Sequence, residues 1–358
     1  MFRYFDNSNS RKKRKRKMKK IIKSLLVACL AIVTFVSCSK DNVNYYDAIP
    51  MQSKALVRVA PEADGKGVAS LELFMGEGAL ASDDSGIDFT SPVYLFAAPD
   101  GSLGACAKVS DDGKINDLLE ALAKSGKASE LKEIKEIKYA VVNKNFLVAY
   151  NENALLTVGP ILAADESKIA KRLMKYLECD AERGIGSADI FKDVEADNSP
   201  ISLIASVSVM PKKLVVPFLI GAPTGTSTDD VVLKAEVNVA DSLLTLKGRT
   251  TSSNLLVSQG IDNAMKMLAS GNSEEIIHVM EANKDLQPML NKGGFREKLQ
   301  KVEGRMLITQ NDNDVDVETL QGGDDNTLMK VVLNLKSLDK EVLNLFEPFL
   351  GGISRIEY

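Results

Sequence analysis

The chain has 358 residues, and its 45 lysines and arginines against 49 aspartates and glutamates give a formal net charge of −4 at pH 7. Hydrophobic residues make up 45% of the sequence, which is ordinary for a globular protein and predicts a packed core. Because there is a single histidine, any catalysis by histidine would have to use that one residue. The lack of tryptophan and the 6% aromatic content disfavour a protein that grips sugars by stacking them on aromatic rings.

The first 37 residues have the pattern of an export signal. A basic stretch precedes an apolar run from Leu25 to Val36, which is followed by Ser37 and Cys38. The run is about a dozen residues long, whereas a transmembrane helix needs roughly 20, so a cleaved signal is favoured over a permanent span. A basic region, an apolar run, a small residue and a cysteine are typical of a bacterial lipoprotein signal. The sequence therefore predicts cleavage before Cys38 and acylation of the new N-terminus.

Two alternatives concern this segment. Cys29 ends a rival cleavage motif, but cleavage there would leave the apolar residues 30–36 on the mature protein, so Cys38 is favoured. Met18 begins an ordinary signal by itself, and residues 1–17 are interpreted as an extension upstream of the true start or as an over-long positive region of the signal. Their run of lysines and arginines resembles a nucleic-acid patch, but a segment that is discarded with the signal cannot bind a partner.

Removal of residues 1–37 changes the charge of the protein. The segment holds 11 of the 45 basic and 1 of the 49 acidic residues, so 34 basic and 48 acidic residues remain and the net charge is about −14. A body this acidic is repelled by phosphate backbones and anionic headgroups, and nucleic acid is not expected as a partner. Membrane contact is expected through the N-terminal acyl chains, and residues 38–48 form a lipidated tether.

Hydrophobic periodicity predicts an α+β fold of antiparallel sheets with amphipathic helices packed on one face. Ile115, Leu118, Leu119 and Leu122 show the spacing of one helical face, for example. In the first half, strands are predicted at residues 55–59, 69–75, 92–97, 103–109, 139–142, 146–150 and 154–158, and helices at 115–124 and 165–179. Asp165 is the expected N-cap of the second helix.

Glycines at 184 and 186 mark a predicted boundary near residue 185, between a domain of residues 49–185 and a domain of residues 186–358. Leu203–Gly221 and Leu328–Gly351 both combine a strand, a polar corner, an apolar helix with Pro-Phe-Leu and a glycine, which suggests two related lobes. Strands are predicted in the second half at residues 201–209, 231–239, 243–247, 306–309, 315–319 and from 328, and helices at 211–219, 259–269, 274–282 and 295–302.

Few residues suggest chemistry. His278 follows Glu274 by four positions, as a metal or acid–base pair on a helix would, but a surface histidine is favoured. Asp312, Asp314 and Asp316 resemble the start of a calcium loop. The glycine and glutamate that such a loop needs at its sixth and twelfth positions are missing, so these residues are only weak metal candidates. No cofactor is expected.

Two cysteines remain after the anchor. Cys106 lies in a predicted strand and Cys179 at the end of a predicted helix. An exported protein can form a disulfide between them, but nothing in their spacing requires them to meet. Two free thiols are the favoured interpretation, with a Cys106–Cys179 bridge as the alternative.

Three stretches resemble a family of Bacteroidetes-type lipoproteins in which a domain of unknown function directly follows the anchor cysteine. They are Cys38–Asn42 with Ile49-Pro50 and Ser53–Val59, Gly86–Phe89 with Ser91–Phe96, and Tyr139–Val142 with Leu147–Glu152. The resemblance covers residues 38–200 and implies an outer-membrane location. Acidic residues after the cysteine favour export to the surface in such proteins. Because only Asp41 matches here, both the surface and the periplasmic face stay open.

We therefore expect a non-catalytic, lipid-anchored envelope protein that binds or scaffolds an envelope protein or polymer, through an apolar patch on a sheet edge or helix face. One alternative is a hydrolase of envelope or dietary polymers, which would need two carboxylates about 5–10 Å apart. The other is a small-ligand or calcium binder.

Overall fold

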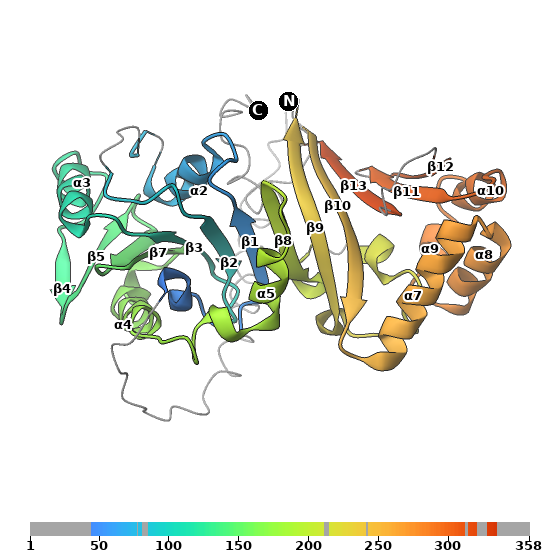
Figure 1. The fold of residues 1–358 in the computed structure, drawn as a ribbon, viewed down its shortest axis with the longest axis horizontal. Helices are drawn as coiled ribbons and strands as arrows, with labels where there is room; N and C mark the ends of the chain where they lie inside the picture. Colours follow the sequence, from blue (N-terminus) through green and yellow to red (C-terminus); the bar gives the residue numbers. More distant parts are fainter. Residues whose placement is uncertain are drawn as a thin grey trace, which may run out of the picture.

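The structure is a computed structural model, and it describes residues 44–76, 78–80, 85–210, 215–240, 243–311, 314–320 and 328–334 (Figure 1). The signal segment, Cys38, Asp312 and almost all of the second strand–helix unit lie outside the described residues. No helix in the described ranges is both long and apolar enough to span a membrane.

The described strands form one 13-stranded sheet in the order β12-β11-β13-β10-β9-β8-β1-β2-β3-β7-β6-β5-β4. Neighbouring strands are antiparallel except β11 and β13, which are parallel. The strands are β1 (Ala55–Val59), β2 (Val93–Ala97), β3 (Leu103–Lys108), β4 (Lys132–Ile134), β5 (Ile137–Val142), β6 (Phe146–Tyr150), β7 (Ala154–Gly159), β8 (Ile201–Ser206), β9 (Val231–Ala240), β10 (Leu243–Ser252), β11 (Met306–Asn311), β12 (Asp314–Thr319) and β13 (Met329–Asn334).

Helices connect these strands and pack on the sheet. The α-helices are α2 (Lys66–Met75), α3 (Asp112–Lys124), α4 (Glu166–Leu177), α5 (Asp189–Glu195), α7 (Leu255–Ser270), α8 (Ser273–Ala282), α9 (Gln287–Leu290) and α10 (Phe295–Gln300). The short 3-10 helices are η1 (Tyr45–Ala48), η2 (Ala163–Asp165), η3 (Ile185–Ser187), η4 (Val207–Val209), η5 (Val216–Leu219) and η6 (Thr228–Asp230). The predicted α+β class with antiparallel pairing is confirmed.

The strand predicted at residues 69–75 is wrong, because this segment is the helix α2. Leu71, Phe74 and Met75 are buried, and their spacing of three and four residues puts them on one helical face. Gly65 precedes the helix in the left-handed conformation, with φ +76°. Ser70 and Glu72 alternate with apolar residues as they would in a strand. A run this short does not distinguish the two-residue period of a strand from the 3.6-residue period of a helix.

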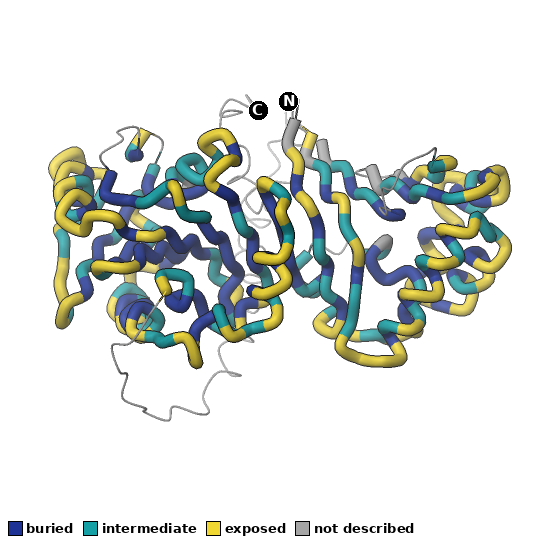
Figure 2. Tube along the Cα trace, viewed as in Figure 1, coloured by how far each residue is buried: buried dark blue, intermediate teal, exposed yellow. Residues whose placement is uncertain are grey.

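Two hydrophobic clusters lie on opposite faces of the sheet. The larger contains Val57 of β1 and extends under α2, α3, α7, α8 and α10. The smaller contains the adjacent Leu56 and lies under η1, α4 and α5. Because successive strand residues point to opposite faces, the first half carries helices on both faces, where packing on one face was expected. Its inner strands are buried along both faces, and every residue of β2 and β7 is buried (Figure 2).

The sheet runs without interruption across the predicted boundary near residue 185. β1 lies between β2 and β8, with Ala55 opposite both Ala97 and Ala205. Pro50 forms an isolated bridge with Gly184. Whether residues 49–185 and 186–358 fold as separate domains stays a prediction.

The turn before β2 contains one of the stretches that carried the family resemblance. Gly86 has φ +78°, and a Cβ there would lie 2.3 Å from the carbonyl oxygen of Asp111, the N-cap of α3. Ser110 and Asp111 both donate backbone hydrogen bonds to the Gly86 carbonyl, at 2.9 and 3.1 Å. The glycine therefore lets the turn approach the start of α3.

Asp88 in this turn stabilises the fold in a pH-dependent way. Hydrogen bonds from Thr90, then an ion pair with Lys108 at 2.9 Å, hold the pKa of Asp88 at about 2, below its ordinary 3.8. Because the pKa is lower in the folded state, this stabilisation is full above pH 4 and is lost as the pH falls toward 2. We expect Asp88→Asn to lower the free energy of unfolding by about 2 kcal/mol at pH 7 and by almost nothing at pH 2. Urea unfolding at both pH values measures this, and equal losses would contradict an electrostatic origin.

Candidate functional site

The second half of the sheet is covered by helices on one face only. Val231, Leu233 and Ala235 of β9 are buried in the larger cluster, whereas Glu236 and Asn238 are exposed. In the part of the chain that the structure describes, α7, α8 and α10 pack on the buried side, and no helix covers the other side (Figures 1 and 2). We call this uncovered side of β9, β10, β13 and β11 the open face.

The open face continues the covered face of the first half. Residues directly opposite each other in a ladder share a face, so the register can be followed from strand to strand. Leu56 lies opposite Ile204, which lies opposite Lys234, which lies opposite Arg249. Leu56 and Ile204 belong to the smaller cluster under η1, α4 and α5. The helices that cover this face therefore end at β8. Beyond β8, the residues at the following register positions are the charged Lys234 and Arg249.

Cations dominate the central strands of the open face. The register places Glu236 opposite Lys247, and Lys247 opposite Lys330. With Lys234 and Arg249, the face carries four cations and one carboxylate. Asp193 on α5 pairs with Lys234 at 2.5 Å, at the border of the covered half. The same side of the sheet continues into β12, because Thr309 lies opposite both Lys330 and Asp316, and it therefore carries charges of both signs.

Acidic residues return at the edge strand β12. Asp316 pairs with Lys298 of α10 at 2.6 Å. Asp314 begins the strand, and Asp312 lies outside the described residues. Among the described residues, no group of three or more histidines, cysteines or acids could hold a metal ion.

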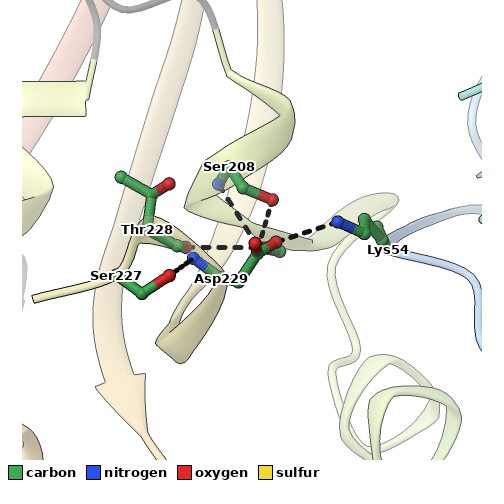
Figure 3. A network of polar contacts seen from close by, with 6 residues as sticks. Lys54, Ser208, Ser227, Thr228 and Asp229 are labelled. Atoms are coloured by element: carbon green, nitrogen blue, oxygen red, sulfur yellow. Dashed lines mark hydrogen bonds and ion pairs between the residues drawn. The ribbon is translucent and has the colours of Figure 1, made fainter. Parts of the chain in front are cut away.

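A polar network fastens the strand ends beside the open face (Figure 3). Lys54 Nζ lies 2.9 Å from Asp229 Oδ1, and the Ser227 hydroxyl accepts from the Asp229 amide at 3.2 Å. Hydrogen bonding by Ser208 and then Lys54 lowers the pKa of Asp229. Both charged side chains are about half exposed, at 45% and 58%. The network links Lys54, the residue before β1, to η4 and η6. It therefore connects the first half of the chain to the second.

The chain enters the fold through η1, which lies on the covered face. The Tyr45 hydroxyl donates to the Pro92 carbonyl at 2.8 Å, and the Cys106 thiol donates to the Tyr45 carbonyl at 3.4 Å. Burial raises the pKa of both Tyr45 and Cys106. Asn44, where the described chain begins, is six residues beyond Cys38.

η1 also buries a carboxyl group. Asp47 is 1% exposed, and its Oδ2 accepts from the Asn44 amide at 3.1 Å. Burial raises the pKa of Asp47. Gly184 lies so close that a Cβ there would be 2.5 Å from the Asp47 backbone. These contacts hold η1, at the start of the described chain, against η3.

A mixed polar and aromatic group attaches α5 beside η1. Arg58 Nε lies 3.0 Å from Glu195 Oε1, which also accepts from the Tyr94 hydroxyl at 2.7 Å. Burial, then the neighbouring Tyr45 and Glu195, raise the pKa of Tyr94. Phe191 of α5 packs 5.6 Å from the Tyr94 ring. These residues stabilise the cover over β1 and β2.

The remaining sequence candidates lie apart from one another. Cys106 is buried on β3 and Cys179 is partly buried after α4, and both are free thiols in the structure. His278 and Glu274 are both exposed on α8. A hollow beside β1 is lined by Val59, Pro61, Val68, Phe89 and other small or apolar residues, with no titratable side chain.

A family model described as a domain of unknown function (DUF4836) matches residues 81–287, which is more than half of the chain. The chain belongs to the DUF4836 family. The region matched by the DUF4836 model runs across the predicted boundary near residue 185, and it includes β9 and β10 of the open face.

Similarity to other proteins is weak. Two solved structures of TP0453, in crystal forms I and IV, match this DUF4836 member with TM-scores of 0.38 and 0.37 and 11% identity. The first covers 68% of this chain and 88% of that chain, and the second 58% and 82%. Similarity at this level does not establish a common fold. None of the curated proteins compared with the chain matches it.

The open face was not recognised from the sequence, which directed attention to an apolar patch. The alternating pattern of β9 did predict a strand with one buried side. The cations, however, come from segments around residues 234, 248 and 330. Only the cross-strand register brings them together, and a sequence pattern does not specify that register.

Proposed function

We propose that this DUF4836 member is a non-catalytic, lipid-anchored protein of the bacterial outer membrane that binds another envelope component through its open face. The proposal is carried by one observation. The open face has charged side chains and no helix over it among the described residues, whereas the other side of the same strands is packed against α7, α8 and α10. Sheets normally bury both faces or leave one face evenly solvated. A bare sheet face with charged side chains of both signs is suited to a partner with a complementary pattern of charge.

The anchor is the second part of the proposal. Cys38 lies at the end of an apolar run of signal length, and Asn44, the N-cap of η1, follows six residues later. The part of the tether between Cys38 and Asn44 spans at most about 20 Å, so an acylated Cys38 would keep the body close to the membrane. Two or more acyl chains make such anchoring stable.

Replacement of the anchor cysteine tests the proposal. We expect Cys38→Ala to move most of the protein from the membrane fraction to the soluble fraction, measured in high salt so that charge attraction is screened. Cys29→Ala is the matched control, and it should leave membrane attachment unchanged. The wild-type mature protein should begin at Cys38 and carry the mass of acyl chains.

The outcomes separate the alternatives. If Cys38→Ala stays on the membrane as wild type does, or if Cys29→Ala is the variant that detaches, the assignment of the anchor is wrong. Proteinase treatment of intact cells then shows which membrane face the body occupies. Loss of the body from intact cells means the surface, and protection until the outer membrane is opened means the periplasm.

A further inference from the structure

We infer that the open face docks onto the open face of a second copy of this chain, related to the first by a two-fold axis parallel to the strands. The inference deepens the proposed function and rests on it for the place where copies meet, which is the membrane that holds their anchors. It names the partner as a second copy, recognised by charges of opposite sign on two strands of the same face.

Charges of opposite sign lie on different strands of this side of the sheet. Along the order β12-β11-β13-β10-β9, the acids Asp316 and Glu318 lie on β12, and Lys247 and Arg249 lie on β10. The two strands between them carry one charged residue on this side, Lys330 of β13. β9, beyond β10, carries one charge of each sign. The face is therefore divided into an acidic edge and a basic centre, about 14 Å apart at the usual spacing of strands.

The acidic and basic residues lie at about the same level along their strands. The register of the two intervening strands, β13 and β11, places Gly248 of β10 level with Val317 of β12. β10 and β12 run in the same direction, because each is antiparallel to one strand of the parallel pair β13 and β11. The next residues, Arg249 and Glu318, are therefore also level with each other, and both are exposed.

A two-fold axis makes this arrangement complementary to itself. An axis that runs parallel to the strands, between β11 and β13, places β12 of each copy over β10 of the other. Glu318 of each copy then lies over Arg249 of the other, and the contact occurs twice, as an isologous interface requires. Asp316 and Lys247 meet in the same way, but both already have partners within the chain, which for Asp316 is Lys298. Selection of a second copy therefore rests on Glu318 and Arg249.

The shape of the sheet suits this contact. Two sheets pack face to face in sandwiches about 10 Å apart, with their strand directions within about 30° of each other. A two-fold axis along the strands brings the same twist against itself, so the two faces stay parallel across their width. α5 packs on β1 and β8, beyond β9, and it therefore flanks the contact without entering it.

The contact is small, so confinement by the anchor contributes to it. Four strands with about five residues each offer roughly 300 Å² per copy, whereas a standard interface buries about 800 Å² per partner. Ion pairs across an interface determine orientation and specificity more than affinity. We therefore expect weak association in solution, with a dissociation constant of about 100 µM. Copies that share a membrane have a raised effective concentration, which favours the pair.

Charge reversal in a chain without acyl groups tests the inference. The protein is expressed from residue 38 with Cys38→Ser, which retains every described element, and this is the parent chain. Sedimentation equilibrium up to about 500 µM should show a monomer–dimer equilibrium. We expect Arg249→Glu alone and Glu318→Lys alone to weaken dimerisation at least about tenfold, because each places like charges opposite each other twice.

Mixing the two single variants is the decisive step. In a dimer of one Arg249→Glu chain and one Glu318→Lys chain, both contacts again join opposite charges. We therefore expect the mixture to dimerise within about threefold of the parent chain, although neither variant does so alone. Only a second copy of the chain as partner accounts for this recovery.

Lys266→Glu and Glu274→Lys form the matched control pair. They reverse charges of the same signs on α7 and α8, which pack on the other side of the sheet, and both residues are exposed. Each control variant, alone or in the mixture, should dimerise as the parent chain does. Thermal unfolding should show that all four variants are folded.

Three results would overturn the inference. They are a parent chain that stays monomeric throughout this range, single variants that dimerise as the parent does, and a mixture that associates no better than its components. In each case the open face would have to bind a different envelope component. Because the tested chain carries no acyl group, these results are independent of whether Cys38 is the anchor.

Discussion

Gly221→Ala is expected to lower the free energy of unfolding by about 3–4 kcal/mol, among the largest single-residue effects in the second half. Gly221 has φ +89°, where a Cβ costs about 1–2 kcal/mol. That Cβ would also lie 2.4 Å from the Gly260 carbonyl oxygen and 2.6 Å from the Ala264 Cβ, both on α7. Relief of this contact would move α7 away from the sheet, at a cost of about 1–3 kcal/mol for overpacking. Urea unfolding measures the loss.

Gly225→Ala separates the two contributions. Gly225 has a similar φ of +78°, but a Cβ there meets nothing within 4 Å. We therefore expect it to cost only the conformational part, about 1–2 kcal/mol. Equal losses for the two variants would show that the close approach of Gly221 to α7 contributes nothing to stability.

Gly184→Ala is expected to be the most damaging small substitution at the entry of the chain. The backbone angles of Gly184, φ −82° and ψ 170°, suit any residue, so the added methyl group acts through contact alone. It would lie 2.5 Å from Cα, Cβ and the carbonyl oxygen of Asp47. Because backbone cannot rotate away as a side-chain tip can, we expect η1 to be displaced and about 2–3 kcal/mol to be lost.

Gly67→Ala is the matched control for this second substitution. Gly67 also has an ordinary φ, and its nearest neighbour to an added Cβ would be Val93 at 3.4 Å, an ordinary contact. Since it lies in α2, alanine should be neutral or stabilise by up to about 1 kcal/mol. Limited proteolysis provides an independent measurement, because release of η1 should expose the chain near Tyr45 in Gly184→Ala alone. A stable, protease-resistant Gly184→Ala protein would contradict the role given to this contact.

Local features of the fold were predictable because they depend on neighbouring residues. The hairpin of β5 and β6 and the amphipathic face of α3 follow from patterns within a few residues. The prediction for residues 69–75 failed because a seven-residue run of mixed apolar and polar residues fits both a strand and a helix. The short helix α5 was missed, since seven residues give too little periodicity to recognise.

Long-range features were not predictable, and the candidate site is one of them. The anchor prediction at Cys38 uses a local signal, so the sequence supports it without any structure. The open face depends on which strand lies beside which, and on a register that brings Lys247 opposite Lys330.

The place of β1 in the sheet has a consequence for how the chain can be made. Its two neighbours come from very different distances along the sequence: Ala55 pairs with Ala97 on one side and with Ala205 on the other. The ribosome releases the chain N-terminus first. The edge of β1 that pairs with β8 therefore stays unpaired until residues 201–206 have been synthesised. Unpaired strand edges invite pairing with other chains, and long-range pairing is slow. The growing chain is thus most vulnerable to aggregation before β8 arrives, and a factor that shields extended chains would act in that interval.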